Sequence, residues 1–202
     1  MPDKRRIIVG ITGASGTILG MRLLQLLQPI DDFETHLVLS PAAIRTLGIE
    51  TGYSADEVRA AADEVHNFRD IGASVASGSF KSEGMIVAPC SVKTLSSVAT
   101  CQSNDLISRA ADVCLKERRR LVLLFRETPL HAGHISLMDQ ATRNGAIIMP
   151  AVIGLYYKPQ SVDEIVDHLA GRALDLLGVD AGSVRRWSGE HGRNIGALDA
   201  DD

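Results

Sequence analysis

Four basic side chains of this sequence could together bind a phosphate group. Arg109 and Lys116 are seven residues apart in one predicted helix, so they share a face two turns along. With Arg126 and Arg172 they could surround a phosphate and form charge-assisted hydrogen bonds to its oxygens. The alternative is an ordinary solvated basic face, because lysine and arginine side chains are usually exposed. Spacing alone leaves both interpretations open.

A second candidate phosphate site follows the first apolar run. That run ends in Gly10, Gly13 and Gly16, and a helical pattern comes next, which predicts a strand, a tight turn and a helix. The free N–H groups and the dipole at such a helix start favour an anion, and the small residues Ala14 and Ser15 let one come close. The same glycine spacing also serves plain strand–helix packing, and the turn is not a P-loop, because no Lys-Ser/Thr pair follows it.

Other reactive residue types have two interpretations each. Glu127, beside Arg126, is either an acid/base group or half of an ion pair. His131 and His134 lack acidic or cysteine partners at metal-binding spacing, which favours helix capping or surface positions, and no Asp-Asp-x-x-Asp cluster is present, so no metal is predicted. Cys90 ends an apolar run and is predicted to be a small core residue rather than a nucleophile.

Alternating strand and helix patterns predict a single α/β domain. We expect a doubly wound, mostly parallel sheet of the Rossmann or flavodoxin-like kind, with helices on both faces. The predicted strands are 7–11, 35–40, 84–90, 121–124 and 146–149, and the helical patterns cover 19–27, 42–47, 54–62, 91–95, 105–118, 135–144 and 161–177. Small residues at 71–80 predict a surface loop or backbone close to a ligand. The domain is expected to span 1–187, with a polar, mobile tail at 188–202.

This fold places its ligands beyond the carboxyl ends of the strands. Four segments bring polar groups to that edge: Gly13–Ser15, Ser40, Ser91–Thr94 and Arg126–Glu127. Ser40 stands where a dinucleotide fold usually has the Asp or Glu that binds the adenosine ribose. The edge is therefore predicted to bind a mononucleotide. Tyr156, with its neighbour Tyr157, could line a pocket or an interface, or pack in the core.

Composition narrows the class of protein. The chain has 202 residues and a net charge of −4 with mixed signs, so it shows no electrostatic footprint for nucleic acid. Its three cysteines lack paired spacing, which favours a reducing compartment. No apolar run approaches the ~20 residues of a membrane span, and the N-terminal residues show no signal peptide. These features predict a soluble cytoplasmic protein.

Taken in order, these motifs resemble those of the UbiX family of flavin prenyltransferases, including members associated with phenolic-acid decarboxylases. The resemblance extends from Arg6 to Trp187. It rests on the segments 10–16 (Gly-Ile-Thr-Gly-Ala-Ser-Gly), 77–80 (Ser-Gly-Ser-Phe), 88–95 (Ala-Pro-Cys-Ser-Val-Lys-Thr-Leu), 108–117, 126–129 (Arg-Glu-Thr-Pro) and 157–161 (Tyr-Lys-Pro-Gln-Ser).

The resemblance implies a metal-independent transfer of a dimethylallyl group from dimethylallyl monophosphate to N5 and C6 of reduced FMN. The prenylated FMN would serve UbiD-type decarboxylases. The resemblance also implies a dodecamer with active sites at the subunit interfaces.

The resemblance also assigns roles to individual residues. FMN would be bound by Gly13, Ala14, Ser15, Ser40, Ser91, Val92, Lys93, Thr94 and Arg126. Dimethylallyl phosphate would be bound by Ser77, Arg109, Lys116, Tyr156 and Arg172. Catalysis would involve Glu127, which assists proton transfer, together with Lys116, Ser15 and Glu50.

Two alternatives remain at this point. An FMN-dependent cysteine decarboxylase of the phosphopantothenoylcysteine or lantibiotic type shares the fold, but it carries a Pro-Ala-Ser-Ala-Asn-like segment where this chain has Pro89-Cys-Ser-Val-Lys93. A non-catalytic FMN-binding subunit of a decarboxylase complex would not need a second phosphate site. Phe125 and the segment 130–134 depart from the family pattern and leave the loop geometry and the preferred prenyl donor open.

Overall fold

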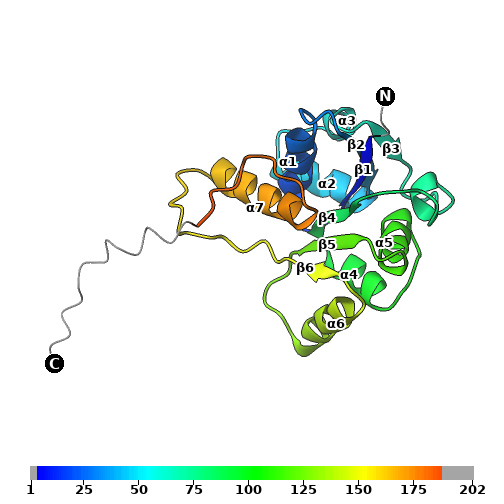
Figure 1. Ribbon diagram of the computed structural model, residues 1–202. Coiled ribbons are helices and arrows are strands. Elements are labelled where there is room, and N and C mark those ends of the chain that lie inside the picture. Colours follow the sequence, from blue (N-terminus) through cyan, green and yellow to red (C-terminus); the bar gives the residue numbers. More distant parts are fainter. Residues whose placement is uncertain (1–3, 188–202) are drawn as a thin grey trace.

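The computed structural model, which describes residues 4–187, has a six-stranded sheet at its centre (Figure 1). The strand order is β3-β2-β1-β4-β5-β6, and every neighbouring pair is parallel. The strands are β1 Arg5–Ile11, β2 Phe33–Leu39, β3 Glu64–His66, β4 Gly84–Cys90, β5 Arg120–Phe125 and β6 Ile147–Ile148. The predicted doubly wound α/β fold is confirmed. The predicted tail, 188–202, lies outside the described residues.

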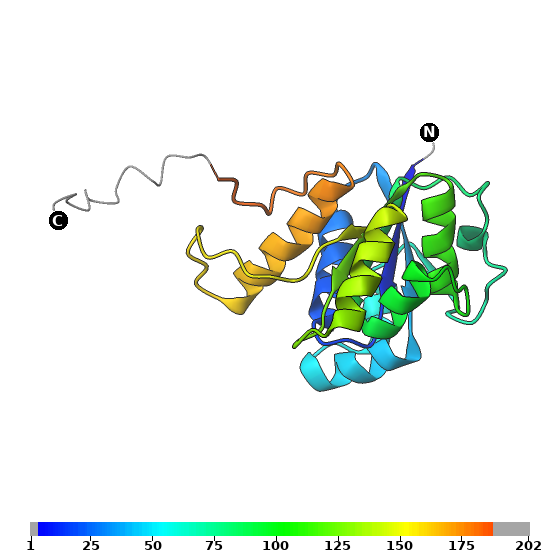
Figure 2. The same ribbon diagram turned by 90° about the horizontal axis from the view of Figure 1, so that it is seen from below.

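Helices cover both faces of the sheet (Figure 2). They are α1 Thr17–Leu27, α2 Pro41–Glu50, α3 Ala55–Ala60, α4 Val92–Ala99, α5 Leu106–Lys116, α6 Ala132–Arg143 and α7 Val162–Leu176. Alternate side chains of β1 divide between two core layers: Ile7 and Val9 pack with α1 and α7, whereas Ile8 packs with α4 and α5. Because both faces are covered, the central strands are continuously apolar. None of the described helices is long and apolar enough to cross a membrane.

The chain reverses its winding direction between β1 and β4. Hydrogen bonds tie the carboxyl ends of these strands together: the Thr12 hydroxyl donates to the Pro89 carbonyl at 2.7 Å and accepts from the Ser91 N–H at 2.9 Å. The Ser40 N–H, after β2, donates to the Ile11 carbonyl at 3.0 Å. Three strand ends are thereby held side by side at the switch point, where open α/β sheets bind their ligands.

Side-chain caps fix where several helices begin. α3 begins with a capping box, in which Ser54 and Glu57 are bonded reciprocally, and the Ser40 and Ser91 side chains cap α2 and α4. Asp105 caps α5 and Ser161 caps α7 in the same way. These caps place the starts of α2 and α4 directly after the strand ends that they follow.

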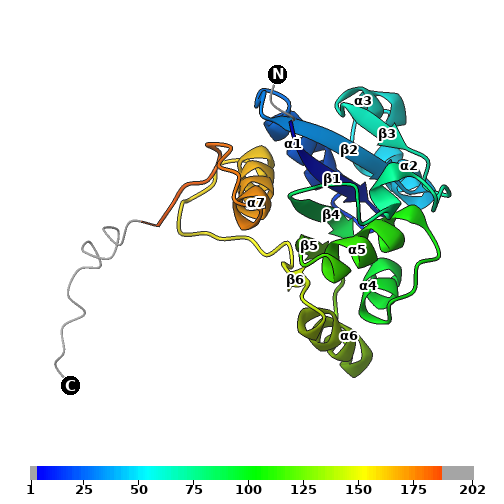
Figure 3. The ribbon, with the colours of Figure 1, turned by 45° about the vertical axis from the view of Figure 1, so that its right-hand side comes forward.

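Two details differ from the predicted elements. The edge strand β3 was not predicted, because three residues with two exposed side chains give no readable alternation. The small-residue segment 71–80 is mostly irregular and contains one short 3-10 turn, Ser74–Ala76. It follows β3 and lies over the sheet face that α5 also covers (Figure 3).

Candidate active site

A cavity of about 260 Å³ opens at the carboxyl ends of β1, β2 and β4. Its walls come from the strand ends, the starts of α2 and α4, and the loop after β3. The lining residues are Thr12, Gly13, Ser40, Pro41, Ala42, Phe68, Ser91, Lys93, Thr94 and Asp105. Five of the nine residues predicted to bind the cofactor, namely Gly13, Ser40, Ser91, Lys93 and Thr94, are therefore brought together by the fold.

Two helix starts meet at this cavity. The Ser40 hydroxyl accepts a hydrogen bond from the Ala43 N–H at 3.1 Å at the start of α2. The Ser91 hydroxyl accepts from the Thr94 N–H at 3.4 Å at the start of α4 and lies 3.2 Å from the Thr94 hydroxyl. Helix N-termini favour anions through their dipoles and free N–H groups. This arrangement suits a phosphate ester with neighbouring hydroxyl groups.

Gly13 lets α2 approach this closely. A Cβ at Gly13 would lie 2.4 Å from the Ala42 Cβ, which is closer than real Cβ contacts allow. Opposite, the Lys93 ammonium lies 3.5 Å from the Asp105 carboxylate and 6.0 Å from the centre of the Phe68 ring. The cavity therefore has a backbone floor on one side and a mobile cationic side chain on the other, since the Lys93 side chain is 73% exposed.

At the start of α1, a carboxylate accepts hydrogen bonds from N–H groups that the glycine turn was expected to offer to an anion. The Glu50 carboxylate accepts hydrogen bonds from the Gly16 N–H at 2.9 Å, the Thr17 hydroxyl at 3.3 Å and the Thr17 N–H at 3.4 Å. Burial opposes ionisation of Glu50, but hydrogen bonds from Ser15, Gly16 and Thr17 outweigh it and lower the pKa of this carboxyl. Two predicted catalytic residues, Ser15 and Glu50, are thus in contact.

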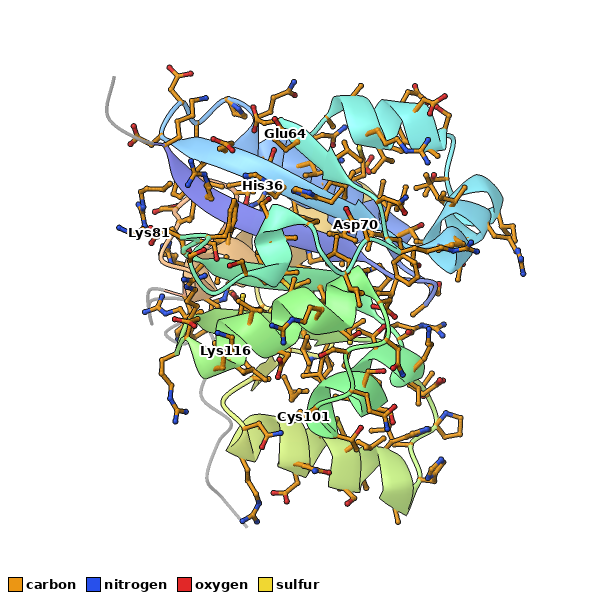
Figure 4. All side chains as sticks on the ribbon, turned by 90° about the vertical axis from the view of Figure 1, so that its right-hand side faces the viewer. His36, Glu64, Asp70, Lys81, Cys101 and Lys116 are labelled. Carbon is orange, nitrogen blue, oxygen red and sulfur yellow. The ribbon has the colours of Figure 1, made fainter. Side chains whose placement is uncertain are left out.

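Near the end of α5, Lys116 lies against Gly78, the residue that follows Ser77 in the sequence. A Cβ on Gly78, the neighbour of Ser77, would lie 2.6 Å from the Lys116 ammonium nitrogen. The Arg119 guanidinium donates to the Gly78 carbonyl at 2.7 Å and holds this turn against α5. Lys116 itself pairs with the Glu117 carboxylate. Figure 4 shows Lys116 on this helix face.

The four-residue phosphate clamp does not form within one chain. Arg109 and Lys116 lie on α5, whereas Arg172 lies on α7 on the opposite face of the sheet. α5 starts at the cavity with Asp105 and ends at Lys116, about 16 Å further along the helix axis. Within the chain, each of these cations pairs with a nearby carboxylate on its own element; Arg109 contacts Asp112 at 2.7 Å, for example.

Tyr156 belongs to the α7 side. Its hydroxyl lies 3.3 Å from His168 Nε2, one turn before Arg172, which bonds to Asp175 at 2.7 Å. The Tyr156 ring also meets Tyr157 edge-on at 5.4 Å. Tyr156 and Arg172 therefore form a second substrate-binding candidate group, separate from Ser77 and Lys116.

The remaining predicted residues lie beside the cavity without lining it. Arg126 follows β5, and its N–H donates to the Cys90 carbonyl at 3.1 Å, which keeps it next to the end of β4. The Glu127 carboxylate accepts from the Thr128 N–H at 2.9 Å. Ala14 adjoins Gly13, and Val92 is the first residue of α4.

His131 and Cys90 have the structural roles predicted for them. His131 caps α6 by accepting from the Gly133 N–H at 3.0 Å. Cys90 is fully buried, and burial raises the pKa of its thiol far above the ordinary value, so it is a core residue and not a nucleophile. Within residues 4–187, no three His, Cys, Asp or Glu side chains cluster as metal ligands would.

Five lining residues were missed by sequence reasoning: Thr12, Pro41, Ala42, Phe68 and Asp105. Thr12 and Asp105 carried readable signals, because one ends the first strand and the other precedes a helix with Ser108 at N3. Phe68 carried none, since only the path of the loop after β3 brings it to the cavity.

Comparisons with known proteins agree with this arrangement. The model of the flavoprotein family matches residues 1–174. The flavin prenyltransferase UbiX of Escherichia coli strain K12 is 52% identical over 187 residues, covering 92% of this chain and 99% of its own length.

Two solved structures extend the comparison. The crystal structure of AnUbiX in complex with FMN and dimethylallyl pyrophosphate matches with a TM-score of 0.90 and 50% identity, covering 93% of this chain and 99% of that one. The dodecameric FMN-dependent UbiX-like decarboxylase of E. coli O157:H7 matches with a TM-score of 0.89 and 46% identity, over 91% of this chain and all of that one. The chain belongs to the flavoprotein family and, within it, to the UbiX flavin prenyltransferases.

Proposed function

We propose that this protein transfers the dimethylallyl group of dimethylallyl monophosphate to reduced FMN, without a metal ion. The observation that carries the proposal is the presence of two kinds of anion site: a cavity at two helix starts, and separate cationic groups on α5 and α7. A protein that only carried a flavin would need the first and not the second. The relative solved with FMN and dimethylallyl pyrophosphate supports a flavin and a phosphate ester of the dimethylallyl group as the two ligands.

The cavity fits FMN. The phosphate would lie against the starts of α2 and α4, where Ser40, Ser91 and Thr94 supply hydroxyl groups. Gly13, Ala14 and Ser15 would contact the flavin through their backbone and small side chains, with Arg126 at the adjoining strand end. When bound in its reduced form, FMN supplies the nucleophilic N5 and C6 positions.

The second phosphate site would be completed across subunit boundaries. Ser77 with Lys116, Arg109, and Tyr156 with Arg172 are three groups on different faces of one chain. Copies of the chain packed around the cavity could bring them to a single phosphate. The exposed apolar side chains Val152, Ile153 and Leu155, beside Tyr156, support such packing, because contiguous apolar surface marks interfaces. A dodecamer, as in the E. coli relative, is the assembly that we propose.

The protein's part in the chemistry is electrostatic. Breaking the allylic C–O bond leaves negative charge on the phosphate, and fixed Arg and Lys donors stabilise that charge as it develops. Lys116, Arg109 and Arg172 would serve in this role, each exchanging its carboxylate partner for the substrate phosphate. Glu127, after β5, would accept or return the proton that moves during ring closure.

The contact between Ser15 and Glu50 gives this pair a defined role. The lowered pKa keeps Glu50 ionised near neutral pH, so its carboxylate accepts the Ser15 O–H. The Ser15 oxygen then presents only lone pairs to the ligand, which directs it toward an N–H or O–H donor. Ser15 is therefore proposed to orient the reacting edge of the flavin.

The product would be prenylated FMN, delivered to a UbiD-type decarboxylase. The proposed setting is the cytoplasm. The three free cysteines, Cys90, Cys101 and Cys114, are compatible with a reducing compartment.

The decisive experiment is anaerobic incubation of the FMN-loaded oligomer with dithionite and dimethylallyl monophosphate, followed by mass analysis of the flavin. Wild-type protein should add one five-carbon unit. Glu127→Gln should still gain this mass but stall at the uncyclised N5 adduct, an isomer of the product that its absorption spectrum distinguishes. Asp139→Asn, in an exposed ion pair on α6, should give the wild-type product. Folded, FMN-loaded wild-type protein that gives no mass gain would refute the proposal in favour of a flavin carrier.

The cysteine decarboxylase alternative is not favoured. The relatives at about half identity are flavin prenyltransferases, and the Pro89–Lys93 segment lacks the decarboxylase pattern. Decarboxylation of a cysteine-terminated peptide by this protein would instead support the cysteine decarboxylase.

A further inference from the structure

A hydrogen-bonded chain of three titratable side chains lies beneath the segment 67–80. His36, in the middle of β2, is buried, with only 3% of its surface exposed. Its Nε2 lies 2.7 Å from the Glu34 carboxylate on the same strand face, and its Nδ1 lies 2.9 Å from Nε2 of His66 on β3. Figure 4 labels His36 on this face of the sheet, with Asp70 on the segment that follows β3. None of the roles proposed above involves these three hydrogen-bonded side chains.

His36 contacts both ends of the segment 67–80. His66 immediately precedes the segment, and at its other end the Phe80 ring meets the His36 ring edge-on at 4.9 Å. Between these ends, the segment carries Phe68, which lines the cavity, and Ser77, which adjoins Lys116. One buried side chain thus links the two ends of a segment that serves both candidate ligand sites, while Arg119 anchors its last turn through the Gly78 and Phe80 carbonyls.

The strand that carries His66 is anchored just before its start, where the Asp63 carboxylate accepts hydrogen bonds from the Thr35 N–H and hydroxyl, and it has fewer bonds at its end. β3 is an edge strand of three residues and pairs only with β2. After His66, the first backbone hydrogen bond to another part of the fold runs from the Leu106 N–H to the Phe68 carbonyl at 2.9 Å. Loss of the bond between the histidines would therefore loosen the start of the segment before it loosened the core.

The number of protons on the His36 and His66 rings decides whether the bond between them can form. His36 Nε2 donates to Glu34, so Nδ1 either accepts from a His66 N–H or, when His36 is charged, donates to a neutral His66. The N···N bond survives with no added proton or with one. With two added protons, both facing nitrogens carry hydrogen and the bond is lost.

We propose that His36 is a positioning residue for prenyl transfer: through His66 and Phe80 it fixes the segment 67–80, and a second proton on the His36–His66 pair releases that segment. The proposal rests on the proposed function in one respect, namely that Ser77 binds the substrate phosphate.

The surrounding charges set the pH range of this release. Burial and the neighbouring His36 lower the pKa of His66, whereas Glu64 and Asp70 oppose the shift. Glu34 from β2 also faces the pair, and Arg6 from β1 lies 3.6 Å from that carboxylate. Because the folded-state pKa is below the ordinary 6.5, the stabilisation by neutral His66 is complete above 6.5 and is lost as the pH falls through the lowered pKa.

Two His66 variants separate hydrogen bonding from titration. His66→Gln keeps an N–H donor near the position of Nε2 but cannot be protonated, whereas His66→Ala loses the bond at every pH. Val65→Thr, which changes an exposed side chain on the same strand, is the matched control. Two measurements apply to the FMN-loaded oligomer between about pH 5 and 8: KM for dimethylallyl monophosphate, and amide hydrogen exchange of residues 67–80.

In wild type and Val65→Thr, KM should rise as the pH falls below 6.5, and so should the exchange of 67–80 relative to its intrinsic rate at each pH. His66→Gln should show no rise in this relative exchange, and only the smaller KM change that the titrating substrate phosphate causes in every variant. His66→Ala should have KM raised about tenfold near neutral pH, as for a lost buried hydrogen bond, with kcat much less affected.

Equal exchange at 67–80 in wild type and His66→Ala would overturn the proposal, as would identical pH profiles for wild type and His66→Gln. The exchange experiment needs no turnover. If wild-type protein failed to transfer the prenyl group, the proposed function would fail while exchange still tested the His36–His66 pair.

Discussion

The cavity at the strand ends and the basic groups on α5 and α7 are built in different ways. The cavity is assembled within one chain, by serines that cap α2 and α4 directly after buried strands. The basic groups lie on separate elements, and each already has a carboxylate partner. Backbone geometry therefore fixes the cavity, whereas the proposed second site would also need its substrate and neighbouring subunits.

This difference follows from what each site must do. A flavin that stays bound through the reaction is best held by helix starts and hydroxyl groups, which cost no rearrangement on binding. A phosphate that departs must be stabilised more strongly as charge develops than before, which calls for cations that the assembled site holds in place. Exposed ion pairs such as Lys116–Glu117 stabilise the free protein little, so little is lost when the substrate displaces the carboxylate.

The largest effect should come from Lys116→Ala. Removing a cation that stabilises the departing phosphate should lower the rate of prenyl transfer about 100-fold or more, while FMN affinity stays unchanged. Stopped anaerobic assays with mass detection measure the rate, and flavin fluorescence measures binding. Lys81→Ala is the matched control, because Lys81 is an exposed lysine on the same side of the molecule (Figure 4). A parallel loss of FMN binding would instead show that Lys116 also belongs to the FMN site.

Mixed oligomers sharpen this prediction. If Lys116 and Arg126 act from different subunits, co-expressed Lys116→Ala and Arg126→Ala chains should form some sites with both side chains intact. Such oligomers should be more active than either pure variant. Activity no higher than that of the parents would place both residues in the same copy of the chain and contradict an inter-subunit site.

Gly13→Ala should disturb the other region. Its Cβ would overlap Ala42, so α2 must move away from β1 at a cost of about 1–3 kcal/mol, and FMN should bind more weakly. Gly48→Ala is the control within α2, where a new Cβ meets nothing within 4 Å and better helix propensity should stabilise by up to about 1 kcal/mol. Urea unfolding and FMN titration measure both effects. Unchanged FMN affinity in Gly13→Ala would show that FMN does not contact the side of the cavity formed by Gly13 and α2.

The same two regions show what a sequence can predict. β4 was predicted with its exact bounds, because a strand buried on both faces is a continuous apolar run that ends at a serine cap. Ser40 and Ser91 were predictable for that reason. β3 was not, since its three residues owe their pairing to β2 and to the His36–His66 contact rather than to their own pattern.

Long-range partners were the harder part of the site. Glu50 is 34 residues away in the sequence from the helix start that it contacts, and no local sequence pattern predicts that contact. The glycine turn therefore predicted a phosphate site where the fold places a carboxylate. Arg109, Lys116 and Arg172 were identified as basic residues near functional motifs, but a single chain keeps them apart, and their joint role stays a prediction until an assembly is measured.

Ser40→Ala should have a smaller effect on stability than Gly13→Ala and a distinct one on binding. Losing the cap of α2 should cost about 1 kcal/mol and weaken FMN binding, because the same hydroxyl lines the cavity. Ser54→Ala removes an equivalent cap from α3, which does not reach the cavity, and should lose stability alone. If both variants bound FMN equally well, the Ser40 hydroxyl would have only a capping role.

The smallest stability effect is expected for Glu50→Gln, and its pH dependence identifies the cause. The carboxylate at the start of α1 should contribute about 0.5–1 kcal/mol near neutral pH, where wild type is ionised. Because the folded-state pKa of Glu50 is below the ordinary 4.5, this contribution is complete above pH 4.5 and is lost as the pH falls through the lowered value. Urea unfolding should therefore show wild type and variant converging in acid.

Glu57→Gln, in the capping box of α3, is the control. Its stability should converge with that of wild type in the same way, but it should keep full transfer activity. Glu50→Gln should lose activity, because the Ser15 hydroxyl is no longer held by a charge. A stability difference that persisted undiminished in acid would show that side-chain packing, and not the carboxylate charge at the start of α1, is what Glu50 contributes.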